Sequence, residues 1–230
     1  MTKLLTVADM TLRELVRRRG VLLLLLLLPL SFYLIRRNDY VGQSVRSLLL
    51  GVGWAVSTAA LFATAASRAI EPRLRLSGYR TYHLYAGRLV SLWALGLALA
   101  VPFYALVVFD APDVRRGGAA LAMLSCVAVA APFGMLIGTL LPRELEGTLL
   151  LLTAIAIQMT IDPADAAAKL TPFWSSREIG TYAVDNADGG YLVRGSVHGI
   201  VFTAALVALV ATATTIRLRR RRHMRYVAAP

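Results

Sequence analysis

The chain has 230 residues, of which 57% are hydrophobic and only 17% charged, and its formal net charge is +12 at pH 7. An ordinary soluble domain is less apolar than this, so the composition indicates a polytopic membrane protein. The basic residues flank apolar runs instead of covering one face of a folded domain, which argues against nucleic acid as a partner. Cys126 is the single cysteine, so the chain forms no internal disulfide.

Residues 4–19 are predicted to form an amphipathic helix in the membrane interface. Apolar residues recur there at helical spacing, opposite a face of acidic and basic residues. Thr6 followed three residues later by Asp9 is typical of a helix start. Such a helix either transmits force into the first membrane span or is a simple anchor, and the sequence leaves both open. The apolar positions are Leu5, Ala8, Leu12, Leu15 and Val16.

Six apolar runs are each predicted to cross the membrane as a helix. Lipid offers no partner for backbone polar groups, so each run must be helical, and a crossing takes about 20 residues. The first run is almost pure leucine, and the fifth is short. A signal peptide is disfavoured for the first run, because a long amphipathic region precedes it and no small-residue cleavage site follows. The predicted spans cover residues 21–36, 47–67, 89–109, 118–141, 147–161 and 196–216.

The basic residues are distributed unequally between the two sides that six crossings create. Most arginines lie before the first run, between the second and third runs, and after the sixth. The positive-inside rule places these segments in the cytoplasm. We therefore predict a multi-pass protein of the bacterial inner (plasma) membrane with both termini cytoplasmic. Residues 162–194 then form an extracellular loop, and residues 217–230 form a cytoplasmic basic tail.

The polar segment at residues 70–85 is predicted to be helical and to lie at the cytoplasmic membrane surface. It is rich in arginine, which cannot lie in lipid, and apolar and aromatic residues recur along it. Two interpretations remain open from the residues alone. The segment is either an inert linker anchored by snorkelling arginines or a docking element for a soluble partner.

The interior of the predicted spans holds no chemistry typical of an enzyme or an ion pathway. No Asp, Glu, Lys or Arg lies near the middle of a span, which argues against ion-coupled transporters and most channels. Gln158 is the most polar intramembrane residue, and it either hydrogen-bonds a neighbouring helix or faces a cavity. Gly134 and Gly138 are typical of close helix packing. Neither Lys3 nor Lys169 follows a glycine, so no phosphate-binding loop is present, and we expect no catalysis, cofactor or metal in this chain.

Four features follow one another along the chain, each of them degenerate on its own. An amphipathic helix leads into the first span, an arginine-rich segment precedes the third span, a charged turn precedes the fifth, and a long outer loop precedes the sixth. The arginine-rich segment is Glu71-Pro72-Arg73-Leu74-Arg75-Leu76-Ser77-Gly78-Tyr79-Arg80, closing with Leu84-Tyr85-Ala86-Gly87-Arg88-Leu89, and the turn is Leu141-Pro142-Arg143-Glu144-Leu145-Glu146-Gly147-Thr148.

In this order the features resemble the permease subunits of ABC-2 type exporters, over nearly the whole chain. The resemblance implies that residues 70–85 form a coupling helix seated in a groove of a separate ATPase, present in two copies, which binds ATP and magnesium. It also implies that a second permease chain, identical or related, faces this one, with the second and fifth spans lining the route. The fifth span is short for this pattern, and the sequence holds no nucleotide-binding domain, so the ATPase must be another polypeptide. The implied coupling residues are Glu71, Arg73, Leu74, Arg75, Gly78, Tyr79, Arg80 and Tyr82.

We therefore predict an all-α six-span permease that exports an amphipathic small molecule, antibiotic or lipid. The alternative is a non-transporting membrane scaffold or assembly factor of the same topology. One face of the second span presents aromatic side chains and one hydroxyl, which suits an amphipathic molecule, although the same face could instead pack against the first or fourth span. The outer loop, an anchored surface loop or a re-entrant lid, is expected to hold Phe173 and Trp174 at headgroup level. The predicted path is Trp54, Thr58, Leu61, Phe62, Thr153, Ile157 and Gln158, and the predicted outer gate is Pro172, Phe173 and Trp174.

Overall fold

The computed structural model describes residues 3–37, 41–141, 143–162 and 165–220. Within these residues the structure has nine α-helices, one short 3-10 helix and no strand. The helices are α1 Lys3–Arg17, α2 Arg19–Arg36, α3 Val41–Ser67, α4 Glu71–Leu76, α5 Thr81–Asp110, α6 Arg116–Leu140, α7 Glu144–Thr160, the 3-10 helix Ala166–Leu170, α8 Trp174–Val184 and α9 Gly189–Arg220.

Five of the described helices are long and apolar enough to cross a membrane, namely α2, α3, α5, α6 and α9. The chain is therefore a multi-pass α-helical membrane protein. The predicted fifth span corresponds to α7, which has 17 residues. At about 1.5 Å per residue α7 is roughly 25 Å long, a little less than the roughly 30 Å of a hydrocarbon core.

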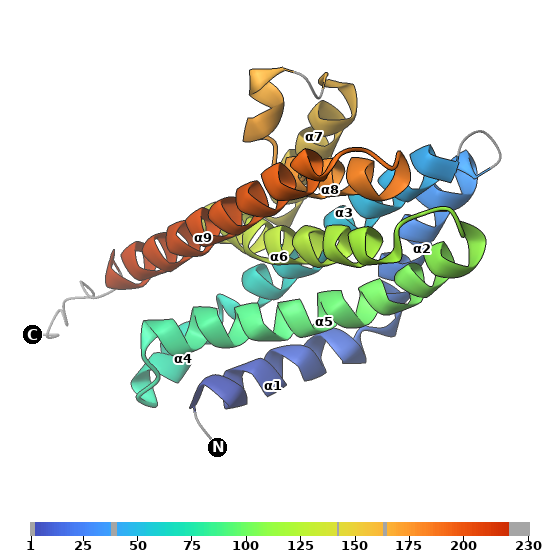
Figure 1. Ribbon diagram of the computed structural model, residues 1–230. Helices are drawn as coiled ribbons and strands as arrows, with labels where there is room; N and C mark the ends of the chain where they lie inside the picture. The colour runs from blue at the N-terminus through green and yellow to red at the C-terminus, as the bar shows by residue number, and fades with distance from the viewer. Residues whose placement is uncertain (1–2, 38–40, 142, 163–164, 221–230) are drawn as a thin grey trace, which may run out of the picture.

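The centre of the bundle is the pair α3 and α6, with α5 and α9 on either side of α6 (Figure 1). Glycines let the two central backbones approach each other. A Cβ atom at Gly134 would overlap the carbonyl oxygen of Ser57, and one at Gly138 would lie 2.9 Å from that of Leu61. The Ser57 hydroxyl also donates to the carbonyl oxygen of Ala130 at 3.0 Å. The Gly134 and Gly138 pair thus serves helix packing inside this chain.

The predicted extracellular loop is mostly helical and well packed, which corrects the sequence expectation. Its α8 helix packs against α6 and α9, and Ile179 and Ala183 are fully buried there. The Phe173 ring is buried within the protein, where it packs against Gly53 of α3 and, edge to face at 6.2 Å between centroids, against Phe133 of α6. Trp174 is buried as well. Burying the apolar side chains of this segment against neighbouring helices is favourable, which explains why the segment is packed.

The elements predicted to be cytoplasmic also differ from the prediction in two respects. The amphipathic helix forms as α1, but its Val7 and Leu15 are buried against the protein, and α1 lies alongside the first half of α5 (Figure 1). The predicted single helix at residues 70–85 is two helices, because the chain turns between α4 and α5. Residues 217–220 of the predicted basic tail belong to α9, while residues 221–230, like Pro142 of the turn before α7, lie outside the described residues.

Candidate functional site

A buried ionic cluster of Glu71, Arg88 and Arg217 joins α4, α5 and α9. Glu71 begins α4 and is 2% exposed, and Arg88 is 3% exposed. The Arg88 guanidinium donates to Glu71 Oε1 at 2.9 Å, while Arg217 pairs with Glu71 Oε2. The hydroxyl of Ser67, the last residue of α3, lies 3.4 Å from Glu71 Oε1. One carboxylate therefore ties four helices together at the end of the bundle that the sequence predicts to be cytoplasmic, here called the inner end.

This burial corrects the predicted role of Glu71 as a contact for an ATPase. A side chain that is 2% exposed and bonded to two arginines offers no surface to a partner. Its function is internal, because a buried carboxylate with two guanidinium partners fixes where α4 stands relative to α5 and α9.

Three other predicted coupling residues also have partners within the chain. Arg75 donates to the carbonyl oxygen of Leu218 in α9 at 3.0 Å. Leu74 and Tyr79 are half-buried and pack on a small apolar cluster formed by α1, α5 and α9. These three side chains are therefore partly occupied by contacts within the chain. The buried members of the cluster are Val7, Leu84 and Leu218.

Gly78 shapes the turn that ends α4. Its φ of 81° lies in the left-handed region, which glycine adopts without strain. The Gly78 amide donates to the Arg75 carbonyl at 3.0 Å, and the Tyr79 amide donates to the Leu74 carbonyl at 3.1 Å, as expected for a glycine helix cap. Lys3 of α1 donates to the Gly78 carbonyl oxygen at 2.8 Å. The turn is thus held from inside and from α1.

Exposed apolar side chains remain just before α4, at its last residue and in the first turn of α5. Leu76 is 90% exposed, and Ile70 and Tyr82 are also exposed. Of the predicted contacts, Arg73 within α4 and Arg80 just before α5 also keep exposed side chains. The sequence analysis did not predict the exposure of Leu76. Helical periodicity does predict it, because side chains two positions apart on a helix point in nearly opposite directions and Leu74 is half-buried. We call these five residues the α4 tip.

The predicted path residues of α3 pack mainly inside this chain. Leu61 is buried against Ile137 of α6 and Leu151 of α7, and Trp54 and Phe62 pack on the same cluster. The competing interpretation, packing against the fourth span, therefore holds for Leu61. On the same face, the indole nitrogen of Trp54 and the hydroxyl of Thr58 are buried and hydrogen-bond no described residue.

The predicted path residues of α7 lie on two different faces of that helix. Leu151, Ile155 and Gln158 are buried against the bundle, whereas Thr153 and Ile157 are exposed. The Thr153 hydroxyl is bonded to the carbonyl oxygen of its own helix one turn back. The structure therefore does not bring the seven predicted path residues to one surface of this chain.

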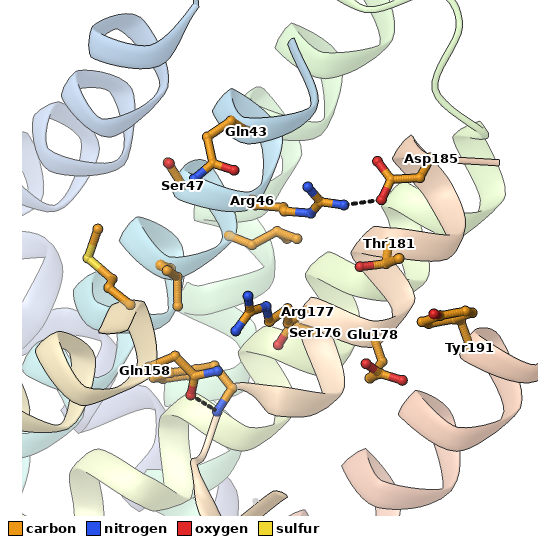
Figure 2. Close-up of a pocket in the computed structure, with 14 residues that line it drawn as sticks. Gln43, Arg46, Ser47, Gln158, Ser176, Arg177, Glu178, Thr181, Asp185 and Tyr191 are labelled. Atoms are coloured by element: carbon orange, nitrogen blue, oxygen red, sulfur yellow. Dashed lines mark hydrogen bonds and ion pairs between the residues drawn. The ribbon is translucent and has the colours of Figure 1, made fainter. Parts of the chain in front are cut away.

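A pocket of about 310 Å³ lies beyond the end of α7, between the N-terminal part of α3 and helices α8 and α9 (Figure 2). We call it the outer pocket, because the sequence predicts its residues of α3 and α8 on the extracellular side. Two predicted residues, Gln158 and Phe173, line it. The Gln158 side-chain oxygen accepts a hydrogen bond from the Phe173 amide at 3.2 Å, so Gln158 both bonds a neighbouring segment and faces a cavity. Sequence reasoning missed the charged lining, because nothing in the spacing connects α3 with α8. The charged lining residues are Arg46, Arg177, Glu178 and Asp185.

No protein-family model matches this chain, and a comparison with curated proteins gave no match. Among the described residues, no group of three or more His, Cys, Asp and Glu side chains is placed to hold a metal ion. The molecule therefore has two candidate functional sites, the α4 tip with its ionic cluster and the outer pocket.

Proposed function

We propose that this chain is the membrane-spanning permease subunit of an ATP-driven exporter, and that the α4 tip docks a separate ATPase. The observation that supports it best is Leu76, an apolar side chain that is 90% exposed at the end of a short helix. Exposed apolar surface beside arginines, as at Arg73 and Arg80, is typical of a protein interface with a polar rim. The predicted ATPase, in two copies, would supply the ATP and magnesium site.

The ionic cluster gives the α4 tip a route to the membrane helices. Because Glu71 is bonded to Arg88 and Arg217 and approaches Ser67, a displacement of α4 is carried to α5, α9 and α3. Packed and hydrogen-bonded elements carry coupling between distant sites more readily than a mobile linker does. This arrangement favours a mechanical role for α4 over an inert linker.

We also propose six crossings with both termini cytoplasmic, α7 being the short fifth one. Val7 of α1 and Leu218 of α9 belong to one apolar cluster, so the two described ends lie at the same end of the bundle (Figure 1). An even number of crossings is needed for that, and five membrane-length helices alone give an odd number. The arginine-rich ends then lie in the cytoplasm of a bacterial cell, in keeping with the positive-inside rule.

A copurification experiment tests the docking proposal. The chain is purified in mild detergent from its native membranes, and ATP hydrolysis in the eluate is measured for the wild type, Leu76→Asp and Leu170→Asp. Leu170 is a matched control, because it is 79% exposed and lies in the segment between α7 and α8. We expect ATPase activity to copurify with the wild type and with Leu170→Asp, and to fall at least tenfold for Leu76→Asp, since a charge in an interface core is costly.

Two results would count against docking at this tip. Equal ATPase activity in both variants would place the contact elsewhere. An eluate without any ATPase activity would favour the alternative of a non-transporting scaffold or assembly factor.

A further inference from the structure

Three of the four charged residues that line the outer pocket form ion pairs with described residues, and Arg177 does not. Arg46 pairs with Asp185, and Glu178 lies 3.3 Å from Arg194 of α9. None of the ion pairs between described residues includes Arg177, whose guanidinium makes one long hydrogen bond of 3.4 Å to the carbonyl oxygen of Ile161. The pocket therefore holds one positive charge that is not in contact with a carboxylate of the described residues.

The position of Arg177 makes that charge costly. Figure 2 shows its guanidinium in the space between Arg46 and Gln158, while the Glu178 side chain leaves α8 on the other side. Burial lowers the pKa of Arg177, and the positive charge of Arg46 lowers it further, against smaller opposing effects of Asp162 and Glu178. A partly desolvated cation facing another cation is stabilised when an anion binds beside it.

Two neutral groups in the pocket are also ready to donate hydrogen bonds. The Phe173 amide can only donate, so the oxygen of the Gln158 side chain must face it, and the Gln158 NH2 group is left for another acceptor. The hydroxyl of Ser176 is buried, lines the pocket and hydrogen-bonds no described residue. Hydrogen-bond donors placed around the Arg177 guanidinium are the groups that bind an oxyanion.

The pocket wall also has an apolar part. It is formed by Leu49, Leu50, Met159 and Phe173, among polar lining residues of α3, α7 and α8. A volume of about 310 Å³ fits the lower end of small-molecule sites. An inorganic ion would leave this wall without a partner, and a neutral hydrocarbon would leave Arg177 unpaired.

We propose that the outer pocket binds an amphipathic anion, with one phosphate, sulfonate or carboxylate group on Arg177 and the apolar portion against Leu50, Met159 and Phe173. This chemistry is shared by an anionic phospholipid and by a soluble amphipathic ligand. The inference does not depend on docking of an ATPase, because the pocket is formed by this chain alone.

Binding is tested with the full chain in phosphatidylcholine nanodiscs. Decyl phosphate is the soluble probe, and phosphatidylglycerol added to the nanodisc is the lipid probe, both followed by native mass spectrometry and equilibrium titration. Inorganic phosphate and decyltrimethylammonium are the comparison probes, the first without the tail and the second with the opposite charge. We expect at least one amphipathic anion to bind tenfold more tightly than either comparison probe, and which one binds tells the soluble ligand from the lipid.

The variants connect the binding to Arg177. Arg177→Gln should weaken binding by about tenfold to a hundredfold, since hydrogen bonds to charged groups contribute that much. Arg177→Lys keeps the charge and should keep most of the affinity, which also guards against a folding defect in Arg177→Gln. Arg116→Gln, at an exposed arginine that begins α6, is the matched control and should bind as the wild type does.

Three results would overturn the proposal. The first is unchanged affinity in Arg177→Gln, and the second is equal binding of the cationic probe. The third is a failure of both amphipathic anions to bind the wild type. Equal binding of inorganic phosphate would refute the apolar part of the site. None of these results bears on copurification of an ATPase.

Discussion

The inner ionic cluster and the outer pocket both contain partly or fully buried arginines, but the arginines meet different partners. At the inner end, Arg88 and Arg217 share the two oxygens of Glu71, and these three side chains together with that of Ser67 link four helices. At the outer end, Arg46 and Glu178 have partners in the chain, whereas Arg177 forms no ion pair with any carboxylate that the structure describes. The inner charges therefore hold the helices in place, and the outer charge is left for a ligand.

The largest expected effect comes from breaking the inner cluster. Glu71→Gln leaves the buried Arg88 without a counter-charge, and removing one partner of a buried ion pair typically costs about 3–5 kcal/mol. We expect a large fall in thermal stability in detergent, together with loss of any copurified ATPase. Glu146→Gln is the control, because its one ion pair with a described residue is to Arg143, whose side chain is 81% exposed. If both variants unfold at the wild-type temperature, the inner charges do not hold the helices.

A smaller effect is expected from Glu178 in the outer pocket, through pH. Burial raises the pKa of Glu178 despite the opposing charges of Arg194 and Arg177. The folded protein then binds this proton more tightly than the unfolded chain does. The contribution of Glu178 to stability is therefore greatest below its unfolded pKa of about 4.3 and falls as pH rises through the higher folded value.

The Glu178→Gln variant should remove this pH dependence. Its thermal stability between pH 4 and pH 7, a window chosen to span the expected titration at about 4.3 and above, should fall less with rising pH than that of the wild type. Asp165→Asn, at an exposed carboxylate outside the pocket, serves as the control and should follow the wild-type curve. If the thermal stability of Glu178→Gln depends on pH as that of the wild type does, Glu178 is stably ionised by Arg194. The outer pocket would then resemble the inner ionic cluster more closely.

The membrane helices were predictable from the sequence, because apolar runs in lipid have little choice but to be helical. The same reasoning found the amphipathic α1. It missed the break between α4 and α5, since Gly78 lies within a polar segment whose residues still recur at helical spacing. It also missed the burial of α8, because Pro172 and the glycines at residues 189 and 190 are typical of a loop.

The pairings that define both regions were beyond the sequence. Glu71 and Arg217 are 146 positions apart, and Arg46 and Asp185 are 139 apart. Local spacing predicts contacts three or four residues away along a helix and says nothing of such distant partners. For this reason the resemblance implies that Glu71 and Arg75 contact a partner protein, although their partners lie in α5 and α9. Leu76, by contrast, was within reach of helical periodicity.

The most direct measurement for the proposed permease role is site-specific crosslinking at the α4 tip. In a Cys126→Ala background, Leu76→Cys and Leu170→Cys are labelled with a photoreactive maleimide in native membranes, and the products are probed with a photoreactive ATP analogue. The docking account predicts that Leu76→Cys yields a crosslinked product that binds the ATP analogue and that Leu170→Cys yields none. A Leu76→Cys product without nucleotide binding, or the same product from both positions, would contradict it.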